Sequence, residues 1–392
     1  WVPYSVTEMQ QMMGRAGRPQ FDTEGIVMIL CEESRKEFLK KFINSPFPVE
    51  SSLLPNIDDH INAEISTGRI RSKKQLAEWI ERSFFGLRLS KNPKYYNNVS
   101  IESVTEETLN DLFTSHCATF TVNGDINATA SGKIGSIYYV SHMTIRLFLD
   151  QMDSVTTIVD VLNLLCHAPE FKDTPLRHNE DDLVSQMIPR FKKDGDDCGT
   201  SATKAFYMVQ YYLSHRKMPI PDFDSDLSTV LDNLLRISGC FCEVCATRHN
   251  LKGMLNAILI GQMIVQGIWY DDVPLKALMN DKMMSELKNK NGIKTLPQLL
   301  LMKKIPNSLV DTCKRILLYK VSKRGLSEDR TSLSVELQRV NGEIGSNVIS
   351  PHFLRKGIQS LYILIGNPET GVLITHRRVQ FKRDTMSVTL KS

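Results

Sequence analysis

The sequence predicts a multidomain, mainly helical protein that ends in a β-sandwich. At 392 residues the chain is too long for one ordinary domain. From Ile137 to Tyr270 the apolar residues recur with a helical period, whereas after Arg330 they alternate with a period of two. These observations indicate a helical middle and a C-terminal sheet region, so several domains follow one another.

The composition narrows the class of protein. With 42% hydrophobic and 23% charged residues, the chain has the balance of a globular protein in water. No apolar run reaches the ~20 residues that cross a bilayer, and residues 1–10 show no signal-peptide pattern. The eight cysteines are scattered and we expect them to be reduced. We therefore expect a nuclear or cytoplasmic protein without a membrane partner.

Residues 1–45 predict the end of an α/β domain. Ser5 and Glu8 have the spacing of a capping box, and the helix that they begin is expected to end at Gly14 and Gly17. The apolar run from Gly25 to Cys31 is bounded by turn residues and predicts a buried strand.

Residues 46–136 predict a winged helix. Three prolines mark a linker, and two helical segments follow, with Leu76, Trp79, Ile80 and Phe84 on one face. Asn123-Gly124 is a hairpin turn signal in the polar segment behind them. Between Ser66 and Lys94 there are eight Lys and Arg but two Glu, a surplus that fits a polyanionic partner as well as a solvated face.

The rest of the chain divides into three predicted parts. Residues 137–270 form a helical bundle, and residues 271–330 form a compact segment with two short helices around Pro306. Residues 331–392 supply four or five strands, which is short of the seven or so of an immunoglobulin-like sandwich. We expect this sandwich to be incomplete and both ends of the chain to be cut.

The densest motif is QMMGRAGRPQFD, which begins at Gln11. Arg15 and Arg18 lie three residues apart, so both guanidinium groups can point the same way from a last helical turn or the loop behind it. Guanidinium pairs with phosphate oxygens through two parallel hydrogen bonds and stays charged, as an arginine finger must. Gly14 and Gly17 let the backbone approach a ligand closely. The alternative is a surface turn with two solvated arginines.

The motif resembles motif VI of the superfamily 2 helicases, in the form of the Ski-two-like branch. The resemblance continues in order along the chain, through PFPVESSLLPNIDDHINAEI, TPLRHNEDDL and PIPDFDSDLSTVLDNLLRI. It implies the end of a second RecA-like lobe (1–45), a winged helix (46–136), a Sec-type bundle (137–270), a helix-loop-helix (271–330) and an immunoglobulin-like domain (331–392).

The resemblance also implies that only part of the nucleotide site belongs to this chain. Arg15 and Arg18 would act as catalytic fingers, with Gln11, Gly14 and Gly17 at the nucleotide. The lysine phosphate loop and the DExH box would lie before Trp1, so ATP and Mg²⁺ belong to the parent protein and we expect this chain alone to bind neither. The partners implied are a nucleic-acid strand, RNA in preference to DNA, and proteins of a large complex.

Three basic residues are candidate nucleic-acid contacts. The family's strand-guiding helix would span Asp224 to about His249 and carries Arg236, which could stack on a base or pair with a phosphate. Arg216 and Lys217 form a short basic cluster that could meet the backbone. A solvated helix face or helix end explains each of them equally well. The charges of Arg177 and Glu180 could tie the bundle to the winged helix.

Cys240, Cys242, Cys245 and His249 offer the ligand types of a zinc site. Structural zinc ligands usually come in two separated pairs on turns. Here Cys242, Cys245 and His249 have helical spacing, and Cys240 and Cys242, two residues apart, do not face each other. Cysteine is also a common small buried residue. We therefore predict no metal site.

Two other classes of protein are alternatives to an active helicase as interpretations of this sequence. A second cassette of such a helicase can serve mainly for protein docking, but the complete motif at Gln11–Arg18 disfavours an inactive cassette. A membrane-translocation co-chaperone shares the Sec-type unit, but it would lack this motif and carry a membrane span.

The chain by itself should therefore hydrolyse no ATP, because it lacks the residues that hold the nucleotide. It should bind single strands weakly and less tightly as salt is raised. A phosphate-release assay with and without RNA checks the first statement; turnover by the purified chain would contradict it.

Overall fold

In the computed structural model the chain divides into two compact units. The first unit comprises Trp1–Asn56 and Glu78–Ile101, and the second comprises Ile57–Ala77 and Glu102–Ser392. The structure describes residues 4–18, 20–43, 49–174, 176–192, 197–277, 295–301, 318–327, 332–341, 350, 360–380 and 383–391.

The first unit begins with two helices, α1 (Val6–Met13) and α2 (Glu33–Ile43). The predicted capping box is confirmed, since the Ser5 hydroxyl accepts from the Glu8 amide and the Glu8 carboxylate accepts from the Ser5 amide. Cap hydrogen bonds of this kind satisfy amides that have no partner inside the helix. The helix therefore begins where the sequence predicts.

The strand predicted from Gly25 to Cys31 is wrong. These residues form no strand, and Ile26, Met28 and Leu30 are 88–99% exposed. A strand needs a neighbour that pairs with its amides and carbonyls, and no strand of the first unit is described that could do so. The apolar run thus has the composition of a buried strand without the sheet that would bury it.

An ionic contact within the first unit holds the chain in place where the winged-helix region begins. The Glu50 carboxylate accepts from the Arg88 guanidinium at 2.6 and 3.0 Å, from Asn92 at 2.9 Å and from the Tyr96 hydroxyl at 3.0 Å. Hydrogen bonds from Arg88, and then Asn92, lower the pKa of Glu50 to about 2. The contact fixes residues 49–51 against α5 (Phe84–Lys91) and the 3-10 turn η2 (Pro93–Tyr96).

The helices and wing of the winged helix come next. They are α3 (Ile57–Ser66), α4 (Lys73–Arg82), α6 (Ile101–Thr114), β1 (Ala118–Phe120) and β2 (Ile126–Ala128). The wing turns at Gly124, as predicted, and the Ile126 amide donates to the Arg71 carbonyl at 2.8 Å. That bond holds the wing against the segment between α3 and α4. Phe84 was expected on the same helix face as Leu76, Trp79 and Ile80 but is 51% exposed. The reason is that α4 ends at Arg82 and Ser83 caps a new helix, α5, so Phe84 does not continue the face of α4.

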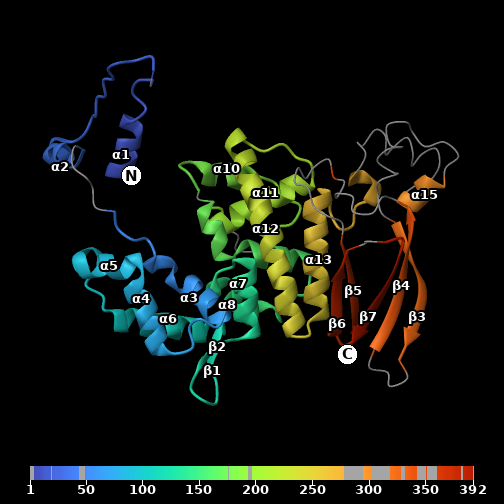
Figure 1. The fold of residues 1–392 in the computed structure, drawn as a ribbon. Coiled ribbons are helices and arrows are strands. Elements are labelled where there is room, and N and C mark those ends of the chain that lie inside the picture. Colours follow the sequence, from blue (N-terminus) through green and yellow to red (C-terminus); the bar gives the residue numbers. More distant parts are fainter. Residues whose placement is uncertain are drawn as a thin grey trace. The chain divides into compact units, whose positions relative to one another are not determined.

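A helical bundle forms the middle of the second unit. Its helices are α7 (Ala130–Tyr138), α8 (His142–Gln151), α9 (Ile158–Cys166), α10 (Glu180–Gln186), α11 (Ser201–Leu213), α12 (Pro221–Thr247) and α13 (Leu251–Gln266). The long α12 runs antiparallel to α13 and also packs on α7, α9 and α11 (Figure 1). It is the helix expected from Asp224 to His249. Its buried side chains face these neighbours.

A buried ionic cluster joins three bundle helices. Lys204 on α11 is fully buried, and its ammonium lies 2.6 Å from the Glu180 carboxylate and 2.7 Å from that of Asp226. Arg177 pairs with the same two carboxylates at 2.9 and 2.7 Å. We had expected Arg177 and Glu180 to tie the bundle to the winged helix; instead they connect α10, α11 and α12 within the bundle.

The C-terminal part contains two antiparallel sheets, with strand orders β3-β4-β7 and β5-β6. The strands are β3 (Leu318–Leu326), β4 (Ser332–Asn341), β5 (Leu361–Asn367), β6 (Val372–Val379) and β7 (Thr385–Lys391). Side chains of β4 and β7 form a small apolar core on which side chains of β5 and β6 pack. β3 begins at Leu318, so the segment expected as helix-loop-helix ends earlier than residue 330. Of its two helices only α15 (Leu296–Leu300) is described, and the part around Pro306 lies outside the described residues.

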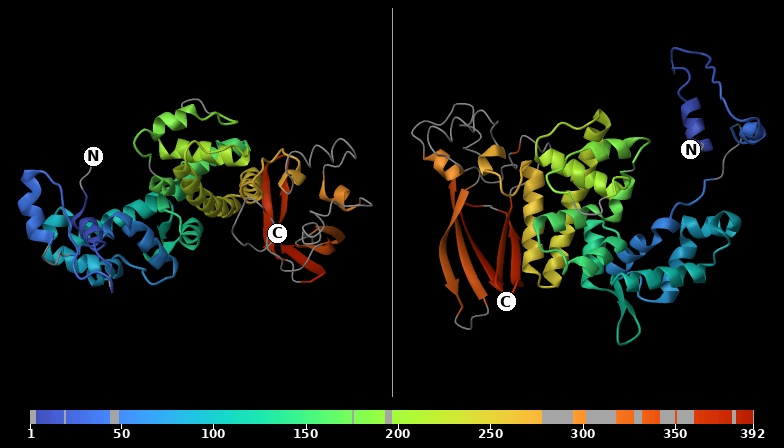
Figure 2. Two further views of the ribbon diagram at one scale, coloured as in Figure 1. Left: turned by 90° about the horizontal axis from the view of Figure 1, so that it is seen from above. Right: turned by 180° about the vertical axis from the view of Figure 1, so that it is seen from behind.

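The β5-β6 hairpin contacts the turn between α12 and α13 (Figures 1 and 2). The Leu251 amide donates to the Gly371 carbonyl at 2.9 Å, and the Leu373 amide donates to the His249 carbonyl at 2.8 Å. The Nδ1 atom of His249 lies 2.9 Å from the Leu373 carbonyl oxygen. In the part of the chain that the structure describes, no helix has the length and apolar character needed to cross a bilayer.

The ionic cluster generates a prediction about stability. Lys204→Met leaves two nearly buried carboxylates with Arg177 as their remaining cation, and removing one partner of a buried ion pair costs about 3–5 kcal/mol. We expect a loss of that size in the free energy of urea unfolding. Lys74→Met, at an exposed lysine, is the matched control. Equal unfolding midpoints for the two variants would contradict the assigned role.

Candidate nucleotide and nucleic-acid contacts

The predicted nucleotide motif forms a closed loop at the end of α1. Gln11 is exposed on the helix, which ends at Met13, and the Gly14 amide donates back to the Gln10 carbonyl at 2.9 Å. Gly17 has a φ of 85°, in the left-handed region that favours glycine. Gly25 then returns so close to Ala16 that a Cβ there would lie 2.9 Å from its carbonyl oxygen. The loop is therefore held by its own backbone.

Both candidate fingers project from this loop into solvent. Arg15 is exposed, and no side-chain ion pair is described for it. Arg18 is 79% exposed, and its Nε lies 3.5 Å from an Asp22 oxygen while the guanidinium lies 5.5 Å from the centre of the Phe21 ring. Such an exposed pair is weak. The arrangement leaves both guanidinium groups accessible to an anion.

Arg236 lies on α12 where this helix packs against α7. Its Nη1 donates to the carbonyl of Tyr138 at 3.2 Å and to that of Tyr139, and its Nη2 donates to the Asn233 side chain at 2.9 Å. The side chain is half-buried. The structure thus gives Arg236 a role at the C-terminal end of α7, and a nucleic-acid contact stays a prediction.

Arg216 and Lys217 lie just after α11 and are exposed. Arg216 donates to the Ile188 carbonyl and lies over the Tyr211 ring at 5.5 Å. The structure does not bring these two residues together with Arg236 by any described contact. Their binding to a nucleic-acid backbone likewise stays a prediction.

The three cysteines of the considered zinc set are buried inside the bundle on α12. Burial raises the pKa of Cys242 to about 12 and those of Cys240 and Cys245 still further, so the thiols are held neutral. His249 instead contacts the Leu373 carbonyl. Among the described residues, no group of three or more potential ligands is placed to hold a metal ion.

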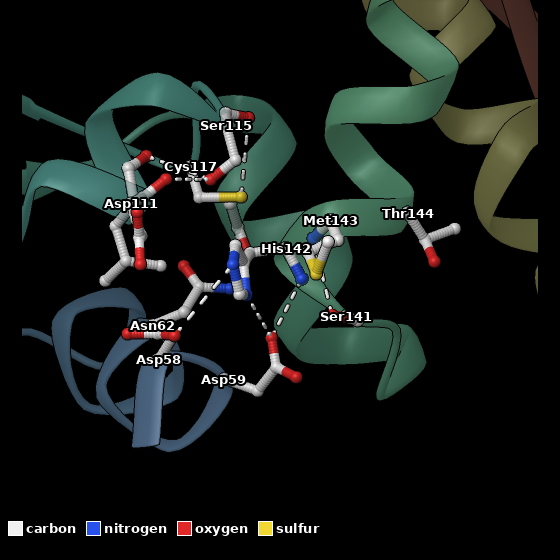
Figure 3. Close-up of polar contacts among 12 residues, drawn as sticks. Asp58, Asp59, Asn62, Asp111, Ser115, Cys117, Ser141, His142, Met143 and Thr144 are labelled. Carbon is white, nitrogen blue, oxygen red and sulfur yellow. Dashed lines mark hydrogen bonds and ion pairs between the residues drawn. The ribbon is translucent and has the colours of Figure 1, made fainter. Parts of the chain in front are cut away.

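A contact that the sequence did not reveal joins the winged helix to the bundle (Figure 3). His142, the first residue of α8, donates its amide to the Asp59 carboxylate of α3 at 2.8 Å, and its ring Nδ1 lies 3.0 Å from the same oxygen. Its Nε2 lies 3.9 Å from Asp58. The two partners are 83 residues apart, so no local pattern could have signalled the pair.

The charge balance around His142 favours its protonated form. Burial by itself lowers the pKa of the ring, but the hydrogen bond to Asp59 and the charges of Asp58, Asp59 and Asp111 outweigh it and raise the pKa. Burial also raises the pKa of Asp58. The imidazolium therefore bridges α3 and α8 most strongly below the pH at which the ring loses its proton.

The chain combines a winged helix, a bundle around one long helix and small antiparallel sheets. A family model described as the Sec63 Brl domain matches residues 128–392, and one described as a winged helix-turn-helix domain matches residues 50–123. The chain therefore belongs to the Sec63 Brl domain family.

Curated relatives agree with this assignment. Activating signal cointegrator 1 complex subunit 3 is 40% identical in Gallus gallus and 39% in Homo sapiens, each over 71% of this chain. The DExH-box ATP-dependent RNA helicase DExH14 of Arabidopsis thaliana is 32% identical over 97% of the chain. The chain spans 13% of the length of the first two relatives and 19% of the third. The resemblance to Ski-two-like helicases is confirmed.

The α3–α8 contact predicts a pH dependence. Because the folded-state pKa of His142 is raised, its stabilisation is fully present below the ordinary value of about 6.5 and is lost as the pH rises through the folded-state value. Between pH 6 and 8.5 the wild-type chain should lose up to about 1 kcal/mol of unfolding free energy that His142→Gln does not lose. His60→Gln, at an exposed histidine of α3, should behave as wild type. Parallel pH profiles for all three proteins would contradict the role of His142.

Proposed function

We propose that the chain works as the C-terminal part of an ATP-dependent RNA helicase. The observation that carries the proposal is the accessible pair Arg15 and Arg18, on a backbone-held loop, in a chain of the Sec63 Brl domain family. ATP and Mg²⁺ would be held by other lobes of such a protein. The two guanidinium groups would then stabilise the charge that develops on the transferred phosphoryl group.

The nucleic-acid strand would pass along α12. This helix is long and packed on several sides, so its exposed residues have fixed positions along about 40 Å of axis, from 27 residues at about 1.5 Å each. Arg236, Arg216 and Lys217 would serve the strand through stacking or phosphate contacts. RNA is proposed before DNA because one relative is named as an RNA helicase.

The C-terminal sheets would bind protein partners. Two relatives carry complexes in their names, activating signal cointegrator 1 complex subunit 3 and the RQC trigger complex helicase SLH1 of Saccharomyces cerevisiae, which is 35% identical over 70% of the chain. An immunoglobulin-like sandwich is the fold we propose for these strands. A nuclear or cytoplasmic location fits such a protein.

The proposal is tested in the full-length helicase. Arg18→Ala and Arg15→Ala should each lower the kcat for RNA-stimulated ATP hydrolysis on the order of 10³-fold, with a smaller change in the KM for ATP. Arg18→Lys should not restore the rate, because an ammonium lacks the two-pronged geometry.

Arg69→Ala is the matched control, since Arg69 is a similarly exposed arginine on the segment between α3 and α4. A kcat that stays within about twofold of wild type in both finger variants would refute catalysis by this loop. That outcome would favour the alternative reading, a cassette used for docking proteins.

A further inference from the structure

Tyr139 is an aromatic residue that projects into solvent at the end of α7. Its side chain is 86% exposed, although its neighbour Val140 is buried. Its backbone has φ 52° and ψ 48°, the left-handed conformation that residues other than glycine adopt at a cost of about 1–2 kcal/mol. A strained backbone that presents an exposed ring is a reason to look for a function.

The end of α7 holds this conformation through its own hydrogen bonds. The Tyr139 amide donates to the carbonyls of Gly135 and Ser136, and the Val140 amide donates to that of Gly135 at 2.9 Å. These bonds are those of a Schellman-type helix end, where glycine usually occupies the left-handed position. The tyrosine therefore occupies a fixed place where glycine would be easier to accommodate.

The long helix α12 donates hydrogen bonds to the same turn. The Arg236 guanidinium donates to the carbonyls of Tyr138 and Tyr139. Gly239, one turn later, lies so close to the Tyr138 ring that a Cβ there would come within 2.9 Å of its Cε1. The backbone that carries the exposed ring is thus fixed relative to α12, the helix proposed to guide the strand.

The place of Tyr139 beside α12, the helix proposed to guide the strand, makes a nucleic-acid base the ligand that we consider. From Ala128 to Leu149 the chain contains no Asp or Glu, whereas it contains Lys133, His142 and Arg146. Lys133 is exposed one and a half turns before Tyr139. The charges near the ring are mixed, because His142 is bonded to Asp59, Arg146 lies 3.6 Å from an Asp150 oxygen and the Ser141 amide donates to Glu170. The exposed ring itself offers a flat surface on which a base of any kind can stack.

We propose that Tyr139 stacks on a base of the single strand and that Arg236 is the residue that positions it. The inference rests on the proposed function, because it assumes that a strand follows α12. It changes the predicted role of Arg236, whose described donors are directed at the protein backbone, from a direct contact to a support.

The first test is the binding of this chain to a fluorescein-labelled 12-nucleotide oligouridine, followed by anisotropy. Tyr139→Ala should weaken binding about 5- to 150-fold, the range expected for loss of one stacked base. Tyr139→Phe should stay within about twofold of wild type, because the ring suffices for stacking. Tyr95→Ala, at a tyrosine that is 61% exposed in the first unit, is the control and should bind as wild type.

The second test separates the ring from the guanidinium. If Arg236 acts through Tyr139, Arg236→Ala should weaken wild-type binding but have no further effect in the Tyr139→Ala background. The slope of log affinity against log salt should be unchanged in both variants, because stacking releases no counterions. A direct phosphate contact by Arg236 would instead lower that slope by about 0.7 and make the two effects multiply.

The outcomes separate the two proposals. If the wild-type chain binds no oligonucleotide even at low salt, the strand-guiding function itself fails. If it binds and Tyr139→Ala binds equally well, the stacking role is refuted while strand guiding stands. Tyr139→Gly checks the fold, since glycine suits the left-handed turn and should leave the unfolding midpoint equal or higher while still losing affinity.

Discussion

The burial of α12 is the constraint on which the second unit depends. A helix of 27 residues cannot hide its apolar side chains by itself, and α12 buries eleven residues along its length. It does so against α7, α9, α11 and α13, and it also contacts β6. The bundle helices and the β5-β6 hairpin therefore share one packing partner, and each contact limits how the others can be arranged.

Polar contacts then determine those relative positions of the helices that apolar packing alone does not determine. Apolar burial has little directional preference, whereas a paired buried charge tolerates few geometries. Lys204 sets the register of α10, α11 and α12, and His142 does so between α3 and α8. Glu50 has the equivalent role in the first unit, where it holds the incoming chain to Arg88. Each of these contacts lies at a junction between elements rather than inside one.

Local patterns predicted the local features. The capping box at Ser5 and Glu8, the long helix near Asp224–His249 and the alternating strands after residue 331 follow from spacing over a few residues. The strand at Gly25–Cys31 failed because apolar composition does not supply a neighbouring strand. The pairing of His142 with Asp59 and of Arg236 with the Tyr139 carbonyl joins residues 83 and 97 positions apart, which periodicity cannot detect.

The hydrogen bonds between β6 and the α12–α13 turn have a mechanical consequence. Because the amides of Leu251 and Leu373 are bonded across this junction, the β5-β6 hairpin meets the helix pair through backbone groups rather than side chains alone. A pulling force on that hairpin would load these bonds and reach the turn from His249 to Leu251 that joins α12 to α13. A partner that bound the sheets and pulled on them would thus transmit force to the α12–α13 pair through this turn. It would need no contact with the exposed residues of α12.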